Sequence, residues 1–282
     1  MKVLITGSSG LVGSALVESL QRDGHDITRL SHGRPWPPLA GHDAVVNLAG
    51  ENIAAGRWTP EKKARIRESR IGLTRQLSEA LARLGQPPKV FLCASAIGIY
   101  GNRGEEVLRE ESAPGDGFLA DVCRDWEAAT QPATDKGVRV VNLRFGVILS
   151  AWGGALAKML TPFKLGLGGV VGDGRQWMSW IALDDAIGAI RHLLATDSLR
   201  GPVNIVAPHP VTNREFTKTL GAVLGRPTVL PLPAFAARLA FGEMADALLL
   251  SGQRVEPAKL AATGYSFQFA DLKSALRHLL DR

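Results

Sequence analysis

The chain has 282 residues, of which 45% are hydrophobic and 21% charged, enough for one large domain or one domain with a smaller appendage. No window approaches the roughly 18 consecutive apolar residues of a membrane-spanning helix, and the first apolar run reaches Gly7 too early for the core of a signal peptide. We therefore expect a cytoplasmic protein with no membrane partner. The net charge of +6 brings nucleotides and nucleic acid into consideration as anionic partners.

Short β-branched runs alternate with longer helical patterns in the first half of the chain, which is typical of parallel strands joined by crossover helices. The sequence therefore predicts an α/β fold, a Rossmann-like doubly wound parallel sheet with a smaller C-terminal α/β substrate region. The predicted strands are 2–6, 26–31, 44–48, 90–95 and 138–143, and the predicted helices are 11–23, a long helix from Thr59-Pro60 to Gly85, and one centred on 122–130.

The texture changes beyond Ser150, where glycines crowd residues 153–174 and predict loop or lid material. Helices at 183–195 and 212–224 flank a predicted strand at 203–206, and a helical tail runs from 234 to a last helix at 272–280. We expect residues 1–150 to form a Rossmann core, with contributions from about 183–210. Residues 151–282 then supply the glycine-rich substrate loop and a small, mostly helical C-terminal domain.

The segment 57–75 carries seven basic residues against two glutamates, and a solvated helix face is the plain interpretation. Cys93 and Cys123 are too few for a disulfide framework or a multi-cysteine metal site, so we expect two buried thiols. The six histidines show no metal-ligand spacing. The sequence therefore predicts no metal.

A glycine motif lies directly between the first predicted strand and the first helix, where a dinucleotide pyrophosphate meets backbone N–H groups. Gly7 allows the tight turn, Gly10 lets a phosphate approach, and Gly13 lets the helix pack closely on the strand. The predicted cofactor-binding residues of this motif are Gly7, Ser8, Ser9, Gly10, Leu11, Val12 and Gly13.

The end of the second strand distinguishes the two nicotinamide cofactors. An NAD-preferring site usually places Asp or Glu there to bind the ribose hydroxyls, whereas this chain has Ser31, His32 and Arg34. These side chains can bond or neutralise a 2′-phosphate, so we predict NADP(H) rather than NAD(H). The alternative is a solvated loop whose polar residues touch nothing.

The Gly-x-x-Gly-x-x-Gly spacing resembles the short-chain dehydrogenase/reductase superfamily, and the Asn47-Leu48-Ala49-Gly50-Glu51 stretch resembles its extended members. Together with Glu51-Asn52-Ile53, Arg57-Trp58-Thr59, Ser69-Arg70-Ile71, Trp126-Glu127, Trp180-Ile181 and the tail through Gly264-Tyr265, it is similar to the epimerase family proteins typified by short-chain dehydrogenase/reductase family 39U member 1. The likeness covers nearly the whole chain.

This resemblance implies cofactor contacts at the glycine loop, Ser31-His32, Leu48, Ala49 and Arg70, with Gly50 and Glu51 in the bordering stretch. The family often has arginine where this chain has His32, and a neutral imidazole contributes less to phosphate binding than a guanidinium. Arg34 is a candidate to compensate for that difference. The alternative for Arg70 is a surface ion pair.

Members of this superfamily use a Tyr-x-x-x-Lys pair and a nearby hydroxyl for proton transfer beside the nicotinamide. Neither of the two tyrosines, Tyr100 and Tyr265, is followed by lysine four residues later. By alignment on Glu127, the pair becomes Leu119 and Cys123. Ser95 and Tyr100 remain as candidate catalytic residues, with a packed aromatic as the alternative for Tyr100.

The sequence thus favours an NADP(H)-binding epimerase-family oxidoreductase that acts on a small-molecule substrate of unknown identity, as a monomer or homodimer. The alternative is a non-catalytic NADP(H)-sensing or interaction protein, for which a division-related role is one form. A nucleic-acid binder is disfavoured, because only Trp58 among aromatics accompanies the basic segment.

Overall fold

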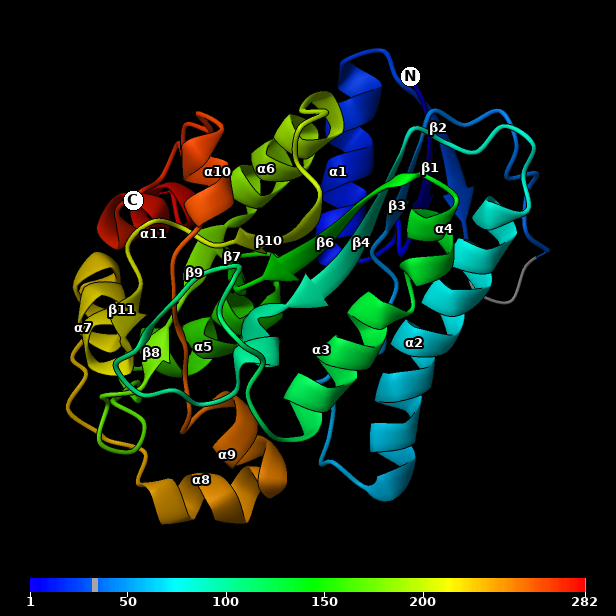
Figure 1. Cartoon of the computed structure of the whole chain (residues 1–282). Coiled ribbons are helices and arrows are strands. Elements are labelled where there is room, and N and C mark those ends of the chain that lie inside the picture. The colour runs from blue at the N-terminus through cyan, green and yellow to red at the C-terminus, as the bar shows by residue number, and fades with distance from the viewer. Residues whose placement is uncertain (32–34, 282) are drawn as a thin grey trace.

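The computed structural model describes residues 1–31 and 35–281, so the predicted cofactor contacts His32 and Arg34 lie outside the described residues. Its centre is a six-stranded parallel sheet in the order β10-β6-β4-β3-β1-β2 (Figure 1). The strands are β1 (Lys2–Thr6), β2 (Asp26–Leu30), β3 (Ala44–Asn47), β4 (Val90–Ala96), β6 (Arg139–Phe145) and β10 (Gly201–Ile205). The strand order reverses between β1 and β3, which makes a topological switch point there.

Strands β1, β3, β4 and β6 are buried along nearly their whole length because both faces of the sheet are covered there, whereas the edge strand β2 is partly exposed. Alternate side chains of β1 enter different cores: Val3 and Ile5 pack on one side, and Leu4 packs on the other. Helices from segments far apart in the chain cover each face (Figure 1). One face carries α1 (Leu11–Arg22) and α6 (Leu183–Ala195), and the other carries α2 (Pro60–Ala82), α3 (Phe118–Ala128) and α4 (Gln131–Asp135).

The remaining elements gather beyond β6 and around the carboxyl ends of the central strands (Figure 1). They are η1 (Ile97–Tyr100), β5 (Val107–Leu108), β7 (Val147–Ser150), α5 (Gly154–Lys164), β8 (Trp177–Met178), β9 (Trp180–Ala182), β11 (Val211–Thr212), α7 (Asn213–Leu224), α8 (Ala234–Phe241), α9 (Glu243–Leu248), β12 (Arg254–Val255), α10 (Ala258–Ala262) and α11 (Leu272–Leu279). A separate apolar core joins α5, α7 and α11 around the fully buried Trp180.

The α/β fold and the parallel sheet predicted from the sequence are confirmed, with strand and helix ends shifted by a few residues. One local prediction was wrong, because α5 occupies much of the glycine-rich segment expected to be loop or lid. The helix begins after Gly153 and buries Leu156, Leu160 and Phe163, so an apolar stripe at helical spacing outweighs the flanking glycines. Within residues 1–31 and 35–281, no helix combines the length and apolar character needed to cross a bilayer.

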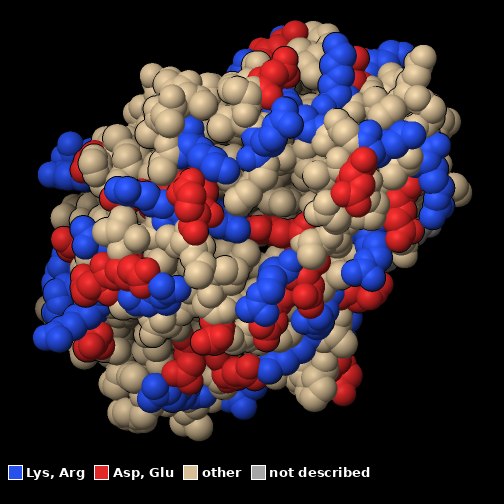
Figure 2. Space-filling model, in the orientation of Figure 1, with Lys and Arg blue, Asp and Glu red and all other residues tan. Residues whose placement is uncertain are grey.

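The prediction that the basic segment 57–75 is a solvated face was wrong for Lys62, which is buried. Arg67 and Arg57 keep exposure to solvent while Arg67 pairs with Asp125 and Arg57 donates hydrogen bonds to the carbonyls of Leu239 and Ala240. Elsewhere, basic and acidic side chains are interspersed over the face drawn in Figure 2. On that face the positive net charge is therefore not gathered into one continuous patch.

Candidate cofactor-binding site

The carboxyl ends of three neighbouring strands bring the predicted cofactor segments to one edge of the sheet. In the strand register, Thr6 of β1 is the partner of Leu30 in β2 and of Asn47 in β3. The residues that follow these three positions, Gly7, Ser31 and Leu48, therefore begin loops at the same edge. This is the edge at the switch point where open α/β sheets bind their ligands.

The glycine loop, residues 7–13, is compact because Gly7 and Gly13 have no Cβ atom at the points where two backbone segments come into contact. Gly7 has φ +66°, and a Cβ there would lie 2.7 Å from the carbonyl carbon of Leu48. A Cβ on Gly13 would lie 2.1 Å from the carbonyl oxygen of Gly7. The Gly10 N–H donates to Gly7 O at 3.0 Å, and the Ser14 N–H donates to Gly10 O at 2.9 Å as α1 begins.

The start of α1 therefore has the form of an anion cradle. The first N–H groups of a helix have no partners within it, and they carry the positive end of the helix dipole. Ser9 and Gly10 are exposed, and Leu11 and Val12 are partly exposed, so the turn faces outward rather than into the core. The absent Cβ atoms and the free helix end fit the pyrophosphate of a dinucleotide.

Arg70 of α2 reaches the loop that follows β3. Its guanidinium donates to Glu51 O at 3.0 Å and to Ile66 O at 3.2 Å, and a Cβ on Gly50 would lie only 3.1 Å from its Cζ. Burial lowers the pKa of Arg70. Within the described part of the chain Arg70 makes no carboxylate salt bridge, so the surface ion pair weighed as its alternative is not what the structure contains.

The Glu51 carboxylate has a different partner. Lys62 Nζ donates to Glu51 Oε1 at 2.5 Å, and that hydrogen bond lowers the pKa of the Glu51 carboxyl group. Lys62 is 5% exposed at its side chain, so the contact also fixes a nearly buried ammonium beneath the loop. The Glu51 N–H donates to Ser69 Oγ at 2.9 Å. Three contacts from α2 therefore hold the loop after β3.

A buried polar chain links the end of β1 to α3 beneath this edge. Thr6 Oγ1 donates to Asn47 Oδ1 at 2.6 Å, and Asn47 Nδ2 donates to Thr74 Oγ1 at 2.8 Å. Trp126 Nε1 donates to the same Thr74 oxygen at 2.9 Å. These side chains are buried, and their mutual hydrogen bonds fix the spacing of β1, β3, α2 and α3.

The structure places the candidate catalytic residue Tyr100 in the core. Its side chain is fully buried, its hydroxyl donates to Asn204 Oδ1 at 2.7 Å, and Arg144 donates to the hydroxyl oxygen at 2.9 Å. Burial raises the pKa of Tyr100, which disfavours release of its proton. This geometry favours the packed-aromatic alternative for Tyr100.

Ser95 is also committed to a contact inside the protein. It is 3% exposed, and its hydroxyl donates to Glu127 Oε1 at 2.7 Å. Arg144 donates to both oxygens of the same carboxylate, at 2.8 and 2.9 Å. A role for Ser95 toward a substrate oxygen, which required a bulge at the strand end, gains no support from this position.

The face of α3 that carries the aligned positions is apolar. Leu119 lies against Gly98, where a Cβ would be 3.4 Å from the leucine Cβ. Cys123 is 4% exposed, and burial raises the pKa of its thiol to about 12. Neither side chain can transfer a proton near neutral pH or bind ribose as a cation.

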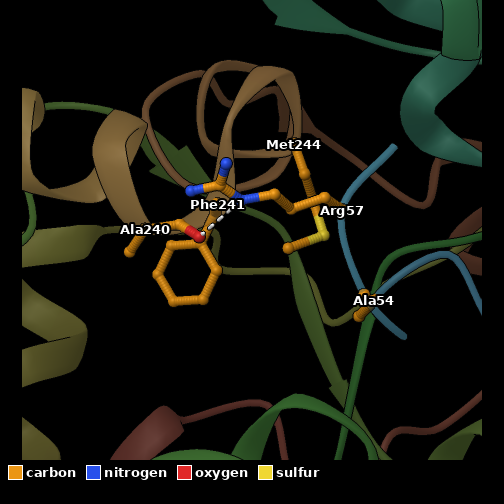
Figure 3. Close-up of a pocket in the computed structure, with 6 residues that line it drawn as sticks. Ala54, Arg57, Ala240, Phe241 and Met244 are labelled. Carbon is orange, nitrogen blue, oxygen red and sulfur yellow. Dashed lines mark hydrogen bonds between the residues drawn. The ribbon is translucent and has the colours of Figure 1, made fainter. Parts of the chain in front are cut away.

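An open pocket of about 180 Å³ lies between the loop after β3 and the C-terminal helices α8 and α9 (Figure 3). Arg57 spans it and donates to the carbonyl of Ala240 at 3.3 Å. Lys158 of α5 donates to the carbonyl of Ala54 at 2.9 Å on the same loop. The lining residues are Ala54, Gly56, Arg57, Ala240, Phe241 and Met244.

The sequence interpretation missed the groups that hold this edge together. Asn47, Thr74, Lys62 and Trp126 received no role in the cofactor site, although Asn47 is a polar residue at the end of the apolar run Ala44-Val45-Val46. That position was the available signal for Asn47.

A second open pocket, of about 360 Å³, is lined by Glu105, Gly174, Arg175, Trp177, Thr212 and Arg214. Trp177 Nε1 donates to Glu105 Oε2 at 2.9 Å at this pocket, and Arg254 lies over the Trp177 ring.

The chain is similar to known proteins over most of its length. Residues 3–206 match the NAD dependent epimerase/dehydratase family, and residues 232–279 match a domain of unknown function. Epimerase family protein Mb2239 of Mycobacterium bovis is 45% identical over 296 residues, covering 99% of this chain and 98% of that protein.

Solved structures extend the likeness to the fold. The human epimerase family protein SDR39U1 (isoform 2), solved with NADPH, superposes with a TM-score of 0.92 at 36% identity and covers 100% of both chains. UDP-glucuronic acid 4-epimerase from Bacillus cereus, solved with UDP-glucuronic acid and NAD, has a TM-score of 0.80 at 17% identity and covers 100% of this chain and 98% of that one. At that identity the second likeness concerns the fold alone.

Proposed function

Because the chain belongs to the NAD dependent epimerase/dehydratase family, we propose that it is an NADP(H)-binding epimerase-family oxidoreductase of the extended short-chain dehydrogenase/reductase type. Its substrate is a small molecule whose identity is unknown. The observation that carries the proposal is the glycine turn of β1 and α1, whose backbone leaves no room for a Cβ at Gly7 or Gly13. Such a tight turn lets the phosphate oxygens of a dinucleotide come close to the backbone N–H groups.

The preference for NADP(H) rests on the charge around the adenosine ribose. Ser31, the residue after β2, is exposed at the cofactor edge, and no carboxylate follows β2 in the sequence before Asp43. A 2′-phosphate therefore meets no negative side chain from this loop. The human SDR39U1 structure contains NADPH, which supports the same cofactor here. Contacts from His32 and Arg34 to the 2′-phosphate remain part of the proposal.

Bound NADPH supplies a hydride for a carbonyl carbon. The chain's part is to bind the cofactor through the glycine turn and Arg70 and to admit a substrate beside the loop after β3. The open pocket at Arg57 and Phe241 borders this loop and is a candidate place for the substrate. Its Arg57 guanidinium offers a charge for an anionic group on that substrate.

A second candidate is a non-catalytic NADP(H)-sensing or interaction protein. One observation favours it: the hydroxyls of Ser95 and Tyr100 are buried and donate to Glu127 and Asn204. The α3 positions that would carry a proton donor are Leu119 and Cys123. On this account the protein binds the cofactor and changes a contact with another molecule, without hydride transfer.

The experiment that separates the two candidates is a single-turnover assay of NADPH oxidation, followed at the nicotinamide absorbance, with a panel of small aldehydes, ketones and oxoacids. Consumption of NADPH in proportion to one carbonyl supports the oxidoreductase. Tight binding without consumption across the panel supports the sensing protein. Tyr100→Phe serves as an added arm, since abolished turnover with normal folding would make Tyr100 catalytic in spite of its burial.

A further inference from the structure

Arg70 is a cation partly removed from water that, among residues 1–31 and 35–281, makes no salt bridge with a carboxylate. Burial lowers its pKa, and its hydrogen bonds go to the carbonyl oxygens of Ile66 and Glu51 and to the Ser69 hydroxyl. The nearby Glu51 carboxylate is bound by Lys62 instead. A partly buried guanidinium of this kind retains its full charge for an incoming anion.

Trp126 stabilises the Arg70 cation in place of a carboxylate. The Arg70 Cζ lies 5.1 Å from the centre of the Trp126 ring, within the range of a cation–π interaction. The ring attracts the guanidinium through its quadrupole and carries no net charge. The attraction therefore holds the cation in place and leaves its charge available to a ligand.

The orientation of the ring is itself fixed. Trp126 is 5% exposed, and its Nε1 donates to Thr74 Oγ1 at 2.9 Å. Thr74 stands four residues after Arg70 on α2, so the two residues lie on one face of the helix. Helix α2 thus provides both the Arg70 cation and the Thr74 hydroxyl that accepts the hydrogen bond from Trp126, the ring on which Arg70 lies. Asn47 connects Thr74 to Thr6, the residue before the glycine turn.

We propose that Trp126 is a positioning residue for the cofactor, which holds the Arg70 guanidinium against the backbone of Gly50 and Glu51 so that it meets an anionic group of NADP(H). This inference rests on the proposed NADP(H) binding. Trp126 acts through Arg70 and needs no contact of its own with the cofactor. Its effect must therefore disappear when Arg70 is neutralised.

The test compares two substitutions that remove the same Nε1–H and differ in the aromatic face. Trp126→Phe keeps a ring for the guanidinium, whereas Trp126→Met fills the space without one. The dissociation constant for NADPH is measured by calorimetry, which avoids dependence on tryptophan fluorescence. We expect Trp126→Met to weaken binding about tenfold and Trp126→Phe to weaken it less than about threefold.

The double variant Arg70→Gln/Trp126→Met completes a mutant cycle with Arg70→Gln alone. The inference requires the double variant to bind NADPH as Arg70→Gln does. Losses that multiply, or equal affinities of the Phe and Met variants, would overturn it. Arg83→Gln at the exposed end of α2 is the matched control and should bind as the wild type does.

The melting temperature of each cofactor-free variant separates folding from binding. If neither Trp126 variant folds, Arg70→Lys decides, because a single ammonium nitrogen cannot replace the two guanidinium nitrogens that bond the carbonyls of Ile66 and Glu51 beside the Trp126 ring. It should then bind about as weakly as Arg70→Gln, and wild-type affinity for Arg70→Lys would contradict the inference. Failure of the wild type to bind NADPH would instead refute the proposed function.

Discussion

The guanidinium of Arg144 on β6 binds both carboxylate oxygens of Glu127 on α3, at 2.8 and 2.9 Å, and the two side chains are only 7% and 13% exposed. The same carboxylate accepts the Ser95 hydroxyl. Arg144 also donates to Tyr100 and to the carbonyl of Glu110. Both catalytic candidates therefore belong to one buried ionic network that joins the sheet to α3.

Breaking this network should cost stability because it leaves a buried charge without its partner. Glu127→Gln removes the negative charge and leaves the Arg144 guanidinium uncompensated, and we expect a loss of about 3–5 kcal/mol in the free energy of unfolding. Urea denaturation measures this loss. Asp121→Asn on the same helix removes an exposed ion pair with Arg124 and should change stability by less than about 1 kcal/mol. Equal effects of the two substitutions would argue against the network.

The second prediction concerns the packing of the glycine turn. An alanine at Gly13 places its Cβ 2.1 Å from the carbonyl oxygen of Gly7, so the turn must open. We expect Gly13→Ala to weaken NADPH binding by more than about tenfold and to destabilise the protein by about 1–3 kcal/mol, although alanine favours a helix over glycine. The matched control is Gly85→Ala, where a Cβ meets nothing within 4 Å. Unchanged NADPH affinity in Gly13→Ala would contradict the cradle.

The third prediction concerns the two thiols. Burial raises the pKa of Cys93 and of Cys123 to about 12 from an ordinary value of 9.0, so both stay protonated in the folded state at pH 8 to 9. Alkylation by iodoacetamide, followed by mass spectrometry, should be slow until denaturant is added. Above pH 9 the unfolded chain loses these protons while the folded protein keeps them, so stability falls as pH rises toward 12. Rapid labelling of either thiol in the native protein at pH 8 would refute its burial.

The fourth prediction concerns attachment of the C-terminal tail to α6. The fully buried Asp185 accepts the backbone N–H groups of Gln268 and Phe269 at 2.7 and 2.9 Å, and Tyr265 donates to its carbonyl at 2.8 Å. Asp185→Ala leaves these N–H groups unpaired and should cost about 2–5 kcal/mol.

Limited proteolysis should cut the Asp185→Ala variant within the tail before it cuts the core. The neighbouring Asp184 provides the control, because its contact with His278 is exposed. Asp184→Ala should change stability by less than about 1 kcal/mol. A tail that resists protease as well in Asp185→Ala as in the wild type would mean that other contacts hold it.

The sheet and the glycine turn could be predicted from the sequence because the patterns that indicate them involve only a few adjacent residues. The run Val3-Leu4-Ile5 before Gly7 reads as a buried strand followed by a tight turn, and Thr59-Pro60 reads as a helix start. Thr59 indeed accepts a hydrogen bond from the Lys62 N–H as the N-cap of α2. Such features depend on a few adjacent residues, so they need no knowledge of the tertiary arrangement.

Contacts between distant elements could not be predicted in the same way. Periodicity marks Trp126 as a core position of its helix, but it does not say that Arg70, 56 residues earlier in the numbering, meets the ring. The burial of Ser95 depends on which way β4 turns its last side chains and on Glu127 of α3 being there to accept a hydrogen bond. Helix α5 was not predicted from the sequence because glycines on both sides of it dominate the local composition and indicate a loop.

The central claim is that the edge formed by the glycine turn, the loop after β3 and Arg70 binds NADP(H) in preference to NAD(H). Parallel calorimetric titrations of the wild-type protein with NADPH and NADH test it most directly. The account predicts that NADPH binds at least about tenfold more tightly, a difference of about 1.4 kcal/mol, and that Arg70→Gln weakens NADPH binding. Equal affinities, or tighter binding of NADH, would contradict it.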